Sequence, residues 1–418
     1  MHSKCHSRAL FKICTLSTLI AASFNTHSAG FQLNAQSATG LGRAFAGDAV
    51  IADNASVMAR NAAAMTLFDS HEFSGGVNVI DTNINISDLG GGMGHGVPDA
   101  QNGSTTPVPN IFYIHRLNDK VALGVGAYSN FGTDNTFSKD FGKESFGGMA
   151  GMLGGTTKIQ SVNFTLNAAY RVNDHWSVGG GLDLVNGVGE LKRPIASNSQ
   201  AQLLDVDAEG WALGFNLGTV YELNKNNRFG LSYRYSPEVK ASGKIEMTDP
   251  IFGSKANYSN QKLILPLPDM LEFSGYHKIE DTKFAVHYSL QWIGWNTFKS
   301  IKTDGGQINS AYNWKDGYHA AIGGTYYLNK SWTLRAGYMY DTSAQDKITS
   351  ISVPDSDRQW FSTGLGYHFN KKHTIDFGFT FLMGKDVKVN QGTVPFDLTA
   401  TTRADAVLAG LQYSYSFK

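Results

Sequence analysis

The sequence predicts an all-β protein: a 14-stranded antiparallel transmembrane β-barrel with an N-terminal plug in its lumen. Three observations predict this fold class. Several segments are apolar at every second residue, short polar turns alternate with long connections, and a glycine-broken segment follows an export signal. No run after that signal reaches the ~18 apolar residues that a membrane helix needs. Barrel strands alternate apolar and polar residues instead, so a hydropathy average does not reveal them.

Residues 1–28 have the composition of a secretory signal peptide. Three basic residues precede an apolar run from 13 to 24, and small side chains favour a cut before Ala29. A lipoprotein signal ending at Cys14 is the alternative, but Lys12 lies where that processing site requires apolar or small residues. Both cysteines, Cys5 and Cys14, lie in this segment, so we expect no structural disulfide and no thiolate metal site in the mature chain.

Alternation is clearest in Trp211–Leu223, where small or polar residues separate apolar or amphipathic ones. That pattern is typical of a strand with one apolar face. It recurs in Phe284–Trp292, Trp332–Tyr340, Ile375–Phe381 and Val407–Phe417. In a soluble sandwich the aromatic faces would need a partner sheet, whereas in a barrel they contact lipid.

Compact polar turns separate these strands. They are Leu117–Lys120, Val172–His175, Leu223–Asn227, Ile279–Thr282, Leu328–Ser331 and Phe369–Lys372. Asn and Asp tolerate left-handed backbone conformations, so these turns suit tight hairpins. Longer connections alternate with them, as outer-membrane barrels have short periplasmic turns and long external loops. Counting strands between these connections gives fourteen, with both chain ends on the periplasmic side.

The outer membrane supplies the partners that such a barrel implies. Lipid and lipopolysaccharide are expected around its wall, and we expect a monomer. The aromatic alternation that ends at Phe417 resembles the signature read by the barrel assembly machinery, although Lys418 follows it. The chain carries 35 basic and 35 acidic residues, so it has no electrostatic footprint for nucleic acid.

Residues 29–68 fit neither a strand nor a lipid-facing wall. A fourteen-stranded barrel is too wide for its own side chains to fill, so its lumen holds water or a plug. Glycines in this segment allow tight turns, and the charged residues Arg43, Asp48, Asp53 and Arg60 are able to pair. We therefore expect a plug at 29–68 and a barrel at 69–418. A disordered periplasmic tail is the alternative, but it would carry fewer apolar residues.

Motifs for catalysis or ion binding are weak. GKES at residues 142–145 lacks the glycine and hydroxyl residue of a phosphate-binding loop. The stretch from Asp81 lacks the glycine and glutamate of a calcium loop. His287 and Ser289 share an inward face, as in outer-membrane phospholipases, but inward polar residues are ordinary lumen lining. The sequence predicts no enzyme, no metal and no cofactor.

Several segments resemble the FadL family of long-chain fatty acid transporters. AGFQLN at 29–34, GLGRAFAGDAVIADNA at 40–55 and RNAA at 60–63 match its plug, or hatch. VPNIFYI from Val108, YSNFG from Tyr128 and SISVPDSDRQW from Ser350 extend the match along nearly the whole mature chain. The resemblance implies a monomeric barrel with a low-affinity external groove, an inner site near the hatch, and lateral release where a strand kinks inward.

The resemblance also implies an inner ligand site at Phe31, Arg193 and Asp341. The guanidinium of Arg193 presents a rigid fork of donors to a carboxylate. The alternative is that Arg193 pairs with Asp341 or another acid only to hold the barrel or the hatch. A second basic residue of the family site aligns with Ser310, and Lys315 lies nearby. Phe31 either lies near the ligand or packs the hatch.

Two backbone motifs follow from the same resemblance. Asn61, Ala62 and Ala63 stand where the family has Asn-Pro-Ala, so the fixed backbone angle of the proline is lost and the gating of the hatch is left open. Ser129, Asn130, Phe131 and Gly132 match the kink that opens the wall. Glycine and asparagine permit such non-strand geometry, although an ordinary strand end is the alternative.

Long external loops supply candidates for the outer groove. Its residues are Phe141, Phe146, Met149, Met152 and Leu153, with Leu203 and Leu204 in the next long loop as the opposite wall. Exposed apolar clusters mark binding surfaces, and flexible methionines suit ligands of variable shape. The alternative is a self-contained lid.

The leading hypothesis is passive, hatch-gated uptake of long-chain fatty acids, with burial of the chain supplying roughly 0.8 kcal/mol per methylene. A nearer alternative keeps the architecture and carries monoaromatic hydrocarbons. A general porin or a surface-binding barrel is the alternative from another class.

Overall fold

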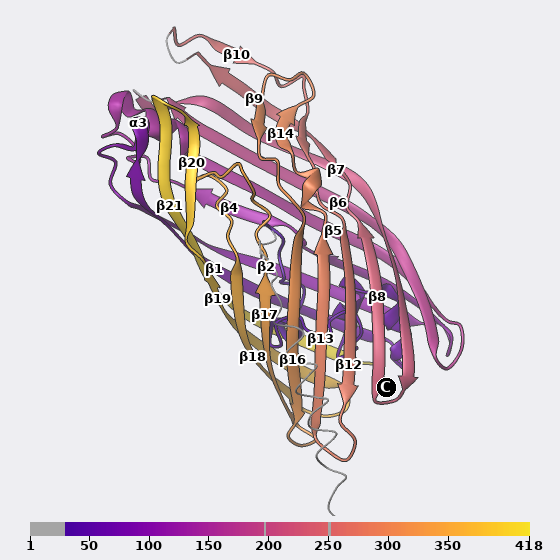
Figure 1. Cartoon of the computed structure of the whole chain (residues 1–418). Helices are drawn as coiled ribbons and strands as arrows, with labels where there is room; N and C mark the ends of the chain where they lie inside the picture. Colours follow the sequence, from indigo (N-terminus) through magenta and orange to yellow (C-terminus); the bar gives the residue numbers. More distant parts are fainter. Residues whose placement is uncertain (1–29, 196–197, 250–251) are drawn as a thin grey trace, which may run out of the picture.

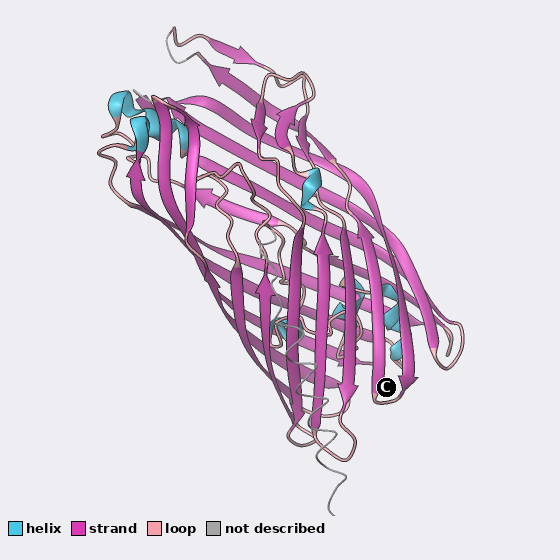
Figure 2. Ribbon diagram, in the orientation of Figure 1, coloured by secondary structure: helices cyan, strands magenta, loops and turns pink. Residues whose placement is uncertain are grey.

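A computed structural model describes residues 30–195, 198–249 and 252–418, so the predicted signal peptide lies outside the described residues. Fourteen antiparallel strands close into a barrel (Figures 1 and 2). Each strand pairs with the next, and the last returns to the first with Ser416 opposite Glu72. In order around the wall they are β1 (Glu72–Gly90), β2 (Ala100–Arg116), β3 (Val121–Tyr128), β5 (Thr156–Arg171), β6 (Trp176–Ile195), β7 (Asn198–Asn224), β8 (Asn227–Tyr235), β12 (Met270–Lys278), β13 (Phe284–Ile293), β16 (Gly317–Tyr327), β17 (Trp332–Asp341), β18 (Arg358–His368), β19 (His373–Gly384) and β21 (Phe396–Ser416).

The other elements lie outside the ring of fourteen wall strands. The remaining strands are β4 (Gly132–Thr136), β9 (Val239–Thr248), β10 (Lys255–Asn257), β11 (Leu263–Leu265), β14 (Ser300–Thr303), β15 (Asn309–Ala311) and β20 (Val387–Thr393). The helical segments are α2 (Ala38–Leu41), α3 (Gly91–Gly94), η1 (Ala55–Ala59), η2 (Ala62–Leu67), η3 (Phe146–Leu153) and η4 (Trp295–Thr297). Within the described ranges, no helix has the length and apolarity of a membrane span.

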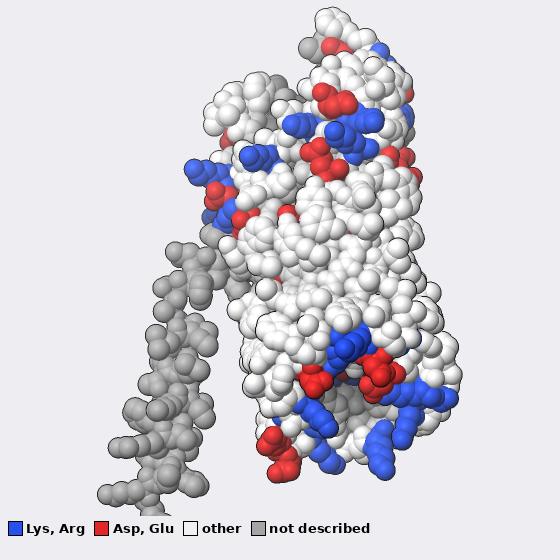
Figure 3. Space-filling view, turned by 90° about the vertical axis from the view of Figure 1, so that its right-hand side faces the viewer, with Lys and Arg blue, Asp and Glu red and all other residues white. Residues whose placement is uncertain are grey.

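All six predicted turns join consecutive wall strands at the end opposite the long loops (Figure 1). The alternation is confirmed as an inside–outside pattern. Leu213 and Leu217 on β7 are about 60% exposed, whereas Asn216 between them is buried. Figure 3 shows a belt without charged side chains between charged zones at the two ends of the barrel, as expected of a wall that contacts the hydrocarbon of a bilayer.

The N-terminal segment lies inside the barrel as a plug, as predicted (Figure 2). Its charged residues pair there. Arg43 contacts Asp48 and Asp53 at 2.6 Å each, and Arg60 contacts Glu272 of β12 at 3.2 Å. Arg335 of β17 lies 3.4 Å from Asp53. Because buried charges are costly unless paired, these ion pairs fix the hatch to the wall.

Two glycines of the wall let the hatch backbone approach closely. A Cβ on Gly337 of β17 would lie 2.1 Å from the carbonyl oxygen of Arg43, and one on Gly378 of β19 would lie 2.3 Å from that of Ala38. Any larger residue would have to displace the hatch. The wall and the hatch are therefore fitted to each other at the level of the backbone.

Candidate functional site

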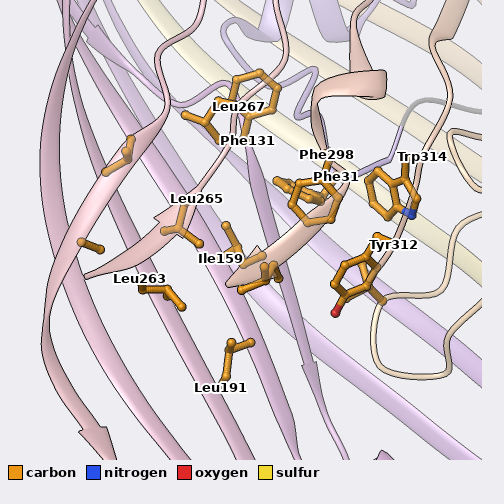
Figure 4. Close-up of a cluster of buried hydrophobic side chains, with 14 of the residues drawn as sticks. Phe31, Phe131, Ile159, Leu191, Leu263, Leu265, Leu267, Phe298, Tyr312 and Trp314 are labelled. Carbon is orange, nitrogen blue, oxygen red and sulfur yellow. The ribbon is translucent and has the colours of Figure 1, made fainter. Parts of the chain in front are cut away.

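Phe31, near the start of the described chain, lies in a cluster of aromatic side chains. Its ring centroid lies 5.3 Å from that of Phe298 and 5.7 Å from that of Trp314 (Figure 4). It lies 4.6 Å from that of Trp295. Phe131 of the predicted kink completes the group at 6.4 Å. Edge-to-face packing of this kind stabilises by about 0.5–1.5 kcal/mol per pair beyond area burial. The cluster thus joins the hatch, the kink and the loop between β13 and β16.

The backbone of Gly30 packs between this aromatic cluster and a group of charged residues that includes Asp355 and Arg358. Its φ is +61°, and a Cβ would lie 2.5 Å from the ring of Trp314, so glycine is required. Its N–H donates to Asp355 at 3.3 Å and its carbonyl accepts from Arg358 at 3.1 Å. The N-terminal end of the hatch is therefore held at both polar atoms of one residue.

Asp341 belongs to that charged group, but it does not meet Arg193. Its carboxylate lies 2.8 Å from Arg358 Nη2 and 3.0 Å from His319 Nε2, and the other ring nitrogen of His319 lies 3.3 Å from Asn34 Nδ2. The guanidinium of Arg193 instead donates to the Thr156 carbonyl and the Thr157 hydroxyl, both at 2.7 Å. Its ligand role and that of Phe31 therefore stay predictions.

Two residues are candidates for the second basic position of the resemblance: Ser310, which aligns with it, and Lys315, which lies nearby in the sequence. Ser310 lies exposed on β15, paired with Ile301 of β14. Lys315 is half-buried in the connection that follows, and its backbone N–H donates to Ala344 at 2.9 Å. Burial lowers the pKa of the Lys315 ammonium against the opposing field of nearby aspartates. Lys315 is thus a cation close to the aromatic cluster, whereas Ser310 is not.

The four residues predicted as a kink interrupt the wall. β3 pairs with β2 only from Arg116↔Ala122 to Ile111↔Ala127, and the strand resumes as β4, which pairs with β5. Between them, Asn130 accepts from the Leu33 N–H at 2.7 Å, and Gly132 donates to the Phe31 carbonyl at 3.0 Å. The kink therefore forms its backbone hydrogen bonds with the hatch. Beyond the interruption, side chains of β2 contact β4, such as Asn102, which donates to Asn135 at 2.8 Å.

A cavity of about 470 Å³ runs from the hatch to this interruption. Inside, it is lined by residues 30–34 and by Arg358 and Trp360. At the wall it is lined by residues 106–111 of β2, by 127–129 and 131–134, and by Phe164 of β5. Ile111 and Phe164 are 50% and 45% exposed, because they stand on the outer face of the wall. The cavity therefore extends from the lumen to the lipid-facing surface.

The predicted hatch motif begins a 3-10 helix. Asn61 is the N-cap of η2: its side chain accepts from the Ala63 N–H and donates to the carbonyls of Ala49 and Thr219 at 2.9 and 3.0 Å. Ala62 is the first helical residue, the position where a proline loses no helical hydrogen bond. The asparagine therefore ties η2 to the hatch and to β7, with alanine in the place of the family proline.

The predicted external groove residues lie in two places. Phe141, Met149 and Leu153 pack against a cluster that includes Ile351, Val389 and Leu398, in the loop assembly around η3 and β20. Leu204 instead packs against the cluster that contains Phe31. Met152 and Leu203 are half-buried, and the side chain of Phe146 lies outside the described part of the chain. A shared groove stays a prediction.

His287 and Ser289 contact the hatch. His287 is buried and its Nε2 lies 3.0 Å from the Thr325 hydroxyl, while the single hydroxyl proton of Ser289 has two acceptors within reach, the Phe45 carbonyl at 3.2 Å and Glu272 at 3.0 Å. Ser289 also accepts from the Gly47 N–H at 2.9 Å. Their observed partners give them a structural role in seating the plug.

Sequence reasoning missed Arg358, His319 and the two tryptophans of the aromatic cluster. Arg358 lies in the segment SDRQW, which carried the resemblance, but nothing in its spacing indicates that it pairs with Asp341. Trp295 and Trp314 stand in the connections that flank β14 and β15, outside any alternating run. The one signal in the sequence was that these tryptophans lie in loops, where a large apolar side chain needs a partner to pack against.

The fold and the cavity define a class: a plugged outer-membrane β-barrel transport protein. The family model described as "Outer membrane protein transport protein (OMPP1/FadL/TodX)" matches residues 19–417, and the chain belongs to that family. It therefore resides in the bacterial outer membrane, in a family of transporters rather than of enzymes.

Relatives and solved structures agree with this assignment. The long-chain fatty acid transport proteins of Salmonella typhi and Escherichia coli strain K12 are each 34% identical over 98% of this chain and 99% of their own. Outer membrane protein P1 of Haemophilus influenzae is 31% identical, over 96% and 97%. The crystal structure of a Pseudomonas aeruginosa FadL homologue has a TM-score of 0.81 at 22% identity, covering 93% of this chain and all of that one. The toluene transporter TodX of Pseudomonas putida has a TM-score of 0.63 at 19% identity, with 87% and 94% covered.

Proposed function

We propose that this protein takes up long-chain fatty acids across the outer membrane by passive diffusion. Four curated relatives with this activity in their names match nearly the whole chain at 34% identity. One structural observation carries the proposal: the cavity that joins the hatch to the outer face of the wall. A cargo that leaves through the wall enters lipid directly, which suits a long apolar chain better than a water-filled exit.

The inner end of the cavity supplies both parts of a fatty acid site. Phe31 and Phe131 of the aromatic cluster line the cavity and give a dry surface for the chain, and Arg358 lines it as a cation. Lys315, next to Trp314, and Arg193, near Tyr312, add positive charge at the margin of the cluster. We infer that the carboxylate is bound here, in the field of these groups. Affinity comes from the chain, at roughly 0.8 kcal/mol per buried methylene.

Gating follows from the contact between hatch and kink. Because Phe31 and Leu33 hydrogen-bond the backbone of the kink, a ligand that displaces Phe31 also loosens residues 130–132. The proposal is that this movement widens the interruption and releases the cargo laterally. The protein works as a monomer, and its apolar belt contacts outer-membrane lipid and lipopolysaccharide. The barrel assembly machinery recognises its last strand.

The first experiment measures uptake of labelled oleate by cells that lack their own transporter, with and without this protein, and with toluene as competitor. Uptake that depends on the protein and persists with toluene supports the proposal. If the protein inserts correctly but no oleate is taken up, the proposed cargo becomes a hydrocarbon, as in the description of TodX as a toluene transporter. Planar-bilayer conductance separates both from an open porin, which would give stable ion-conducting channels.

Lateral release is tested by removing the interruption. Deletion of Ser129–Phe131 lets β3 run directly into β4, and oleate uptake is expected to fall to the background of cells without the protein. Deletion of the exposed residues 305–307, in the turn between β14 and β15, is the matched control and should leave uptake unchanged. Full uptake by the first variant would show that the cargo leaves by another route.

A further inference from the structure

Beside the interruption, β2 has two chemical features with no role assigned so far. The first is Asn110, the residue next to the last β2–β3 pair, Ile111↔Ala127. It is 5% exposed and lines the cavity. Both its Nδ2 and its Oδ1 are buried without a hydrogen-bond partner among the described residues. A buried carboxamide with neither atom satisfied costs several kcal/mol on transfer scales, so such a group indicates a missing partner.

The second feature is the direction of the backbone groups. Arg116 and Ser104 donate their N–H groups to His71 and Thr82 on the β1 side, at 3.0 and 3.1 Å, whereas Leu117 donates toward Val121 of β3. N–H direction alternates along a strand, so even-numbered residues of β2 face β1 and odd-numbered residues face the interruption.

Pro107 and Pro109 are therefore the residues whose nitrogens face the opening. Proline has no N–H, so at these two positions the edge presents carbonyl oxygens and no donor. A backbone N–H left unpaired inside a membrane would be costly. An edge with both unpaired N–H and unpaired C=O groups would also be a template on which another strand could pair. The two prolines keep the edge of β2 from pairing while leaving its acceptors free.

We propose that Asn110 and the carbonyl edge of Pro107 and Pro109 form a head-group subsite at the opening of the wall, which takes the cargo as the neutral carboxylic acid. The inference rests on the proposed function and adds the chemical form in which the cargo leaves. A carboxamide and a –COOH group complement each other, since amide N–H donates to the acid carbonyl and acid O–H donates to the amide oxygen. A carboxylate has no proton to donate, and the carbonyl edge repels it.

The proton comes from the solvent that reaches the cavity. The carboxylate binds inside near the cations, takes up one proton as it leaves them, and reaches Asn110 as –COOH. Desolvation at the wall favours this uncharged form, because burial raises the pKa of a carboxylic acid. The arginine end and the asparagine end of the cavity thus bind the two protonation states of one head group.

The test compares two cargoes in cells that carry equal amounts of inserted protein. Initial uptake of labelled oleate and of labelled methyl oleate is measured for the wild type and for Asn110→Leu. Methyl oleate has no O–H to donate, so it depends less on the amide oxygen. Oleate uptake is expected to fall about fivefold to thirtyfold relative to methyl oleate, the range of one or two neutral hydrogen bonds.

Thr106→Val is the matched control, since Thr106 lines the same cavity four residues away and also loses a polar group. It should leave the ratio of the two uptakes unchanged. Equal losses for both cargoes in Asn110→Leu, or no loss, would overturn the subsite. If the leucine variant does not insert, Asn110→Ala is measured in the same way. A wild type that takes up no oleate removes the proposed function itself, and the subsite with it, before any variant is compared.

Discussion

Two seams of the barrel wall differ: the pairing of β6 with β7 is continuous, whereas the pairing of β2 with β3 is interrupted. The first is continuous from Trp176↔Tyr221 to Arg193↔Leu204. The second ends after Ile111↔Ala127. β6 and β7 alternate small and apolar residues without a proline until Pro194, whereas β2 has prolines at 107 and 109. The comparison teaches that an opening in a barrel needs an edge that lacks donors as well as a strand that turns away.

The largest effect is expected from breaking the continuous seam. Leu217 of β7 is paired with Gly180 on one side and with Tyr233 on the other. Leu217→Pro removes a ladder hydrogen bond whichever way the N–H points, so it should destabilise by about 2 kcal/mol or more, the cost of a buried acceptor left without its donor. Urea unfolding followed by tryptophan fluorescence measures this. Leu217→Ala, which keeps the N–H, is the control, and equal losses for the two would show that the ladder does not matter here.

A smaller effect is expected at the inner end of the path that leads to the open seam. Arg193→Ala should weaken binding of oleate roughly tenfold or more relative to oleyl alcohol, as a lost charge-assisted hydrogen bond predicts. Isothermal titration in detergent measures both affinities. Equal losses for acid and alcohol would remove the carboxylate role and leave Arg193 as the residue that fixes Thr156 and Thr157. Arg358→Ala, which removes the cation that lines the cavity, tests which of the two dominates.

Restoring donors to the open seam should reduce transport several-fold without unfolding the barrel. In Pro107→Val with Pro109→Val, two new N–H groups face the opening, and pairing across it satisfies them. Oleate uptake should fall, and amide exchange should show protection at both positions. Unchanged uptake with unprotected amides would mean that the prolines do not keep the edge open. The control is Val108→Thr, a substitution of the residue between them that adds no backbone donor.

The smallest effect is expected in the hatch, at the start of η2. Asn61 already has φ −148° and ψ 108°, the extended region that precedes a proline. Ala62→Pro should therefore stabilise the protein by about 0.4–1 kcal/mol through the entropy of the unfolded chain. A thermal melt measures it, and Ala63→Pro, one residue into the helix, should not stabilise. A loss of stability in Ala62→Pro would show that the backbone at this position has departed from the family geometry.

The barrel and its hatch were predictable from sequence because their signals are local. Alternation in Trp211–Leu223 and the polar turns lie within single hairpins, and the apolar and glycine content of residues 29–68 excludes a strand. The site was less accessible. Asp341 faces Arg358 and His319 rather than Arg193, because register between strands, which no local pattern encodes, decides which side chains meet. The role of Pro107 needs the direction of an N–H, which depends on that register too.

The seating of the hatch has a consequence for how the protein folds. Ala38 donates its N–H to Gln412 of β21, a contact between residues 374 apart in sequence, and Leu41 accepts from Thr380 of β19 across 339. Contacts this distant form late, because the loop that they close is long. β21 is also the strand that seals the cylinder against β1. Burial of residues 30–68 and closure of the cylinder by β21 are therefore coupled, and a nascent barrel that lacks β21 also lacks a partner that seats Ala38.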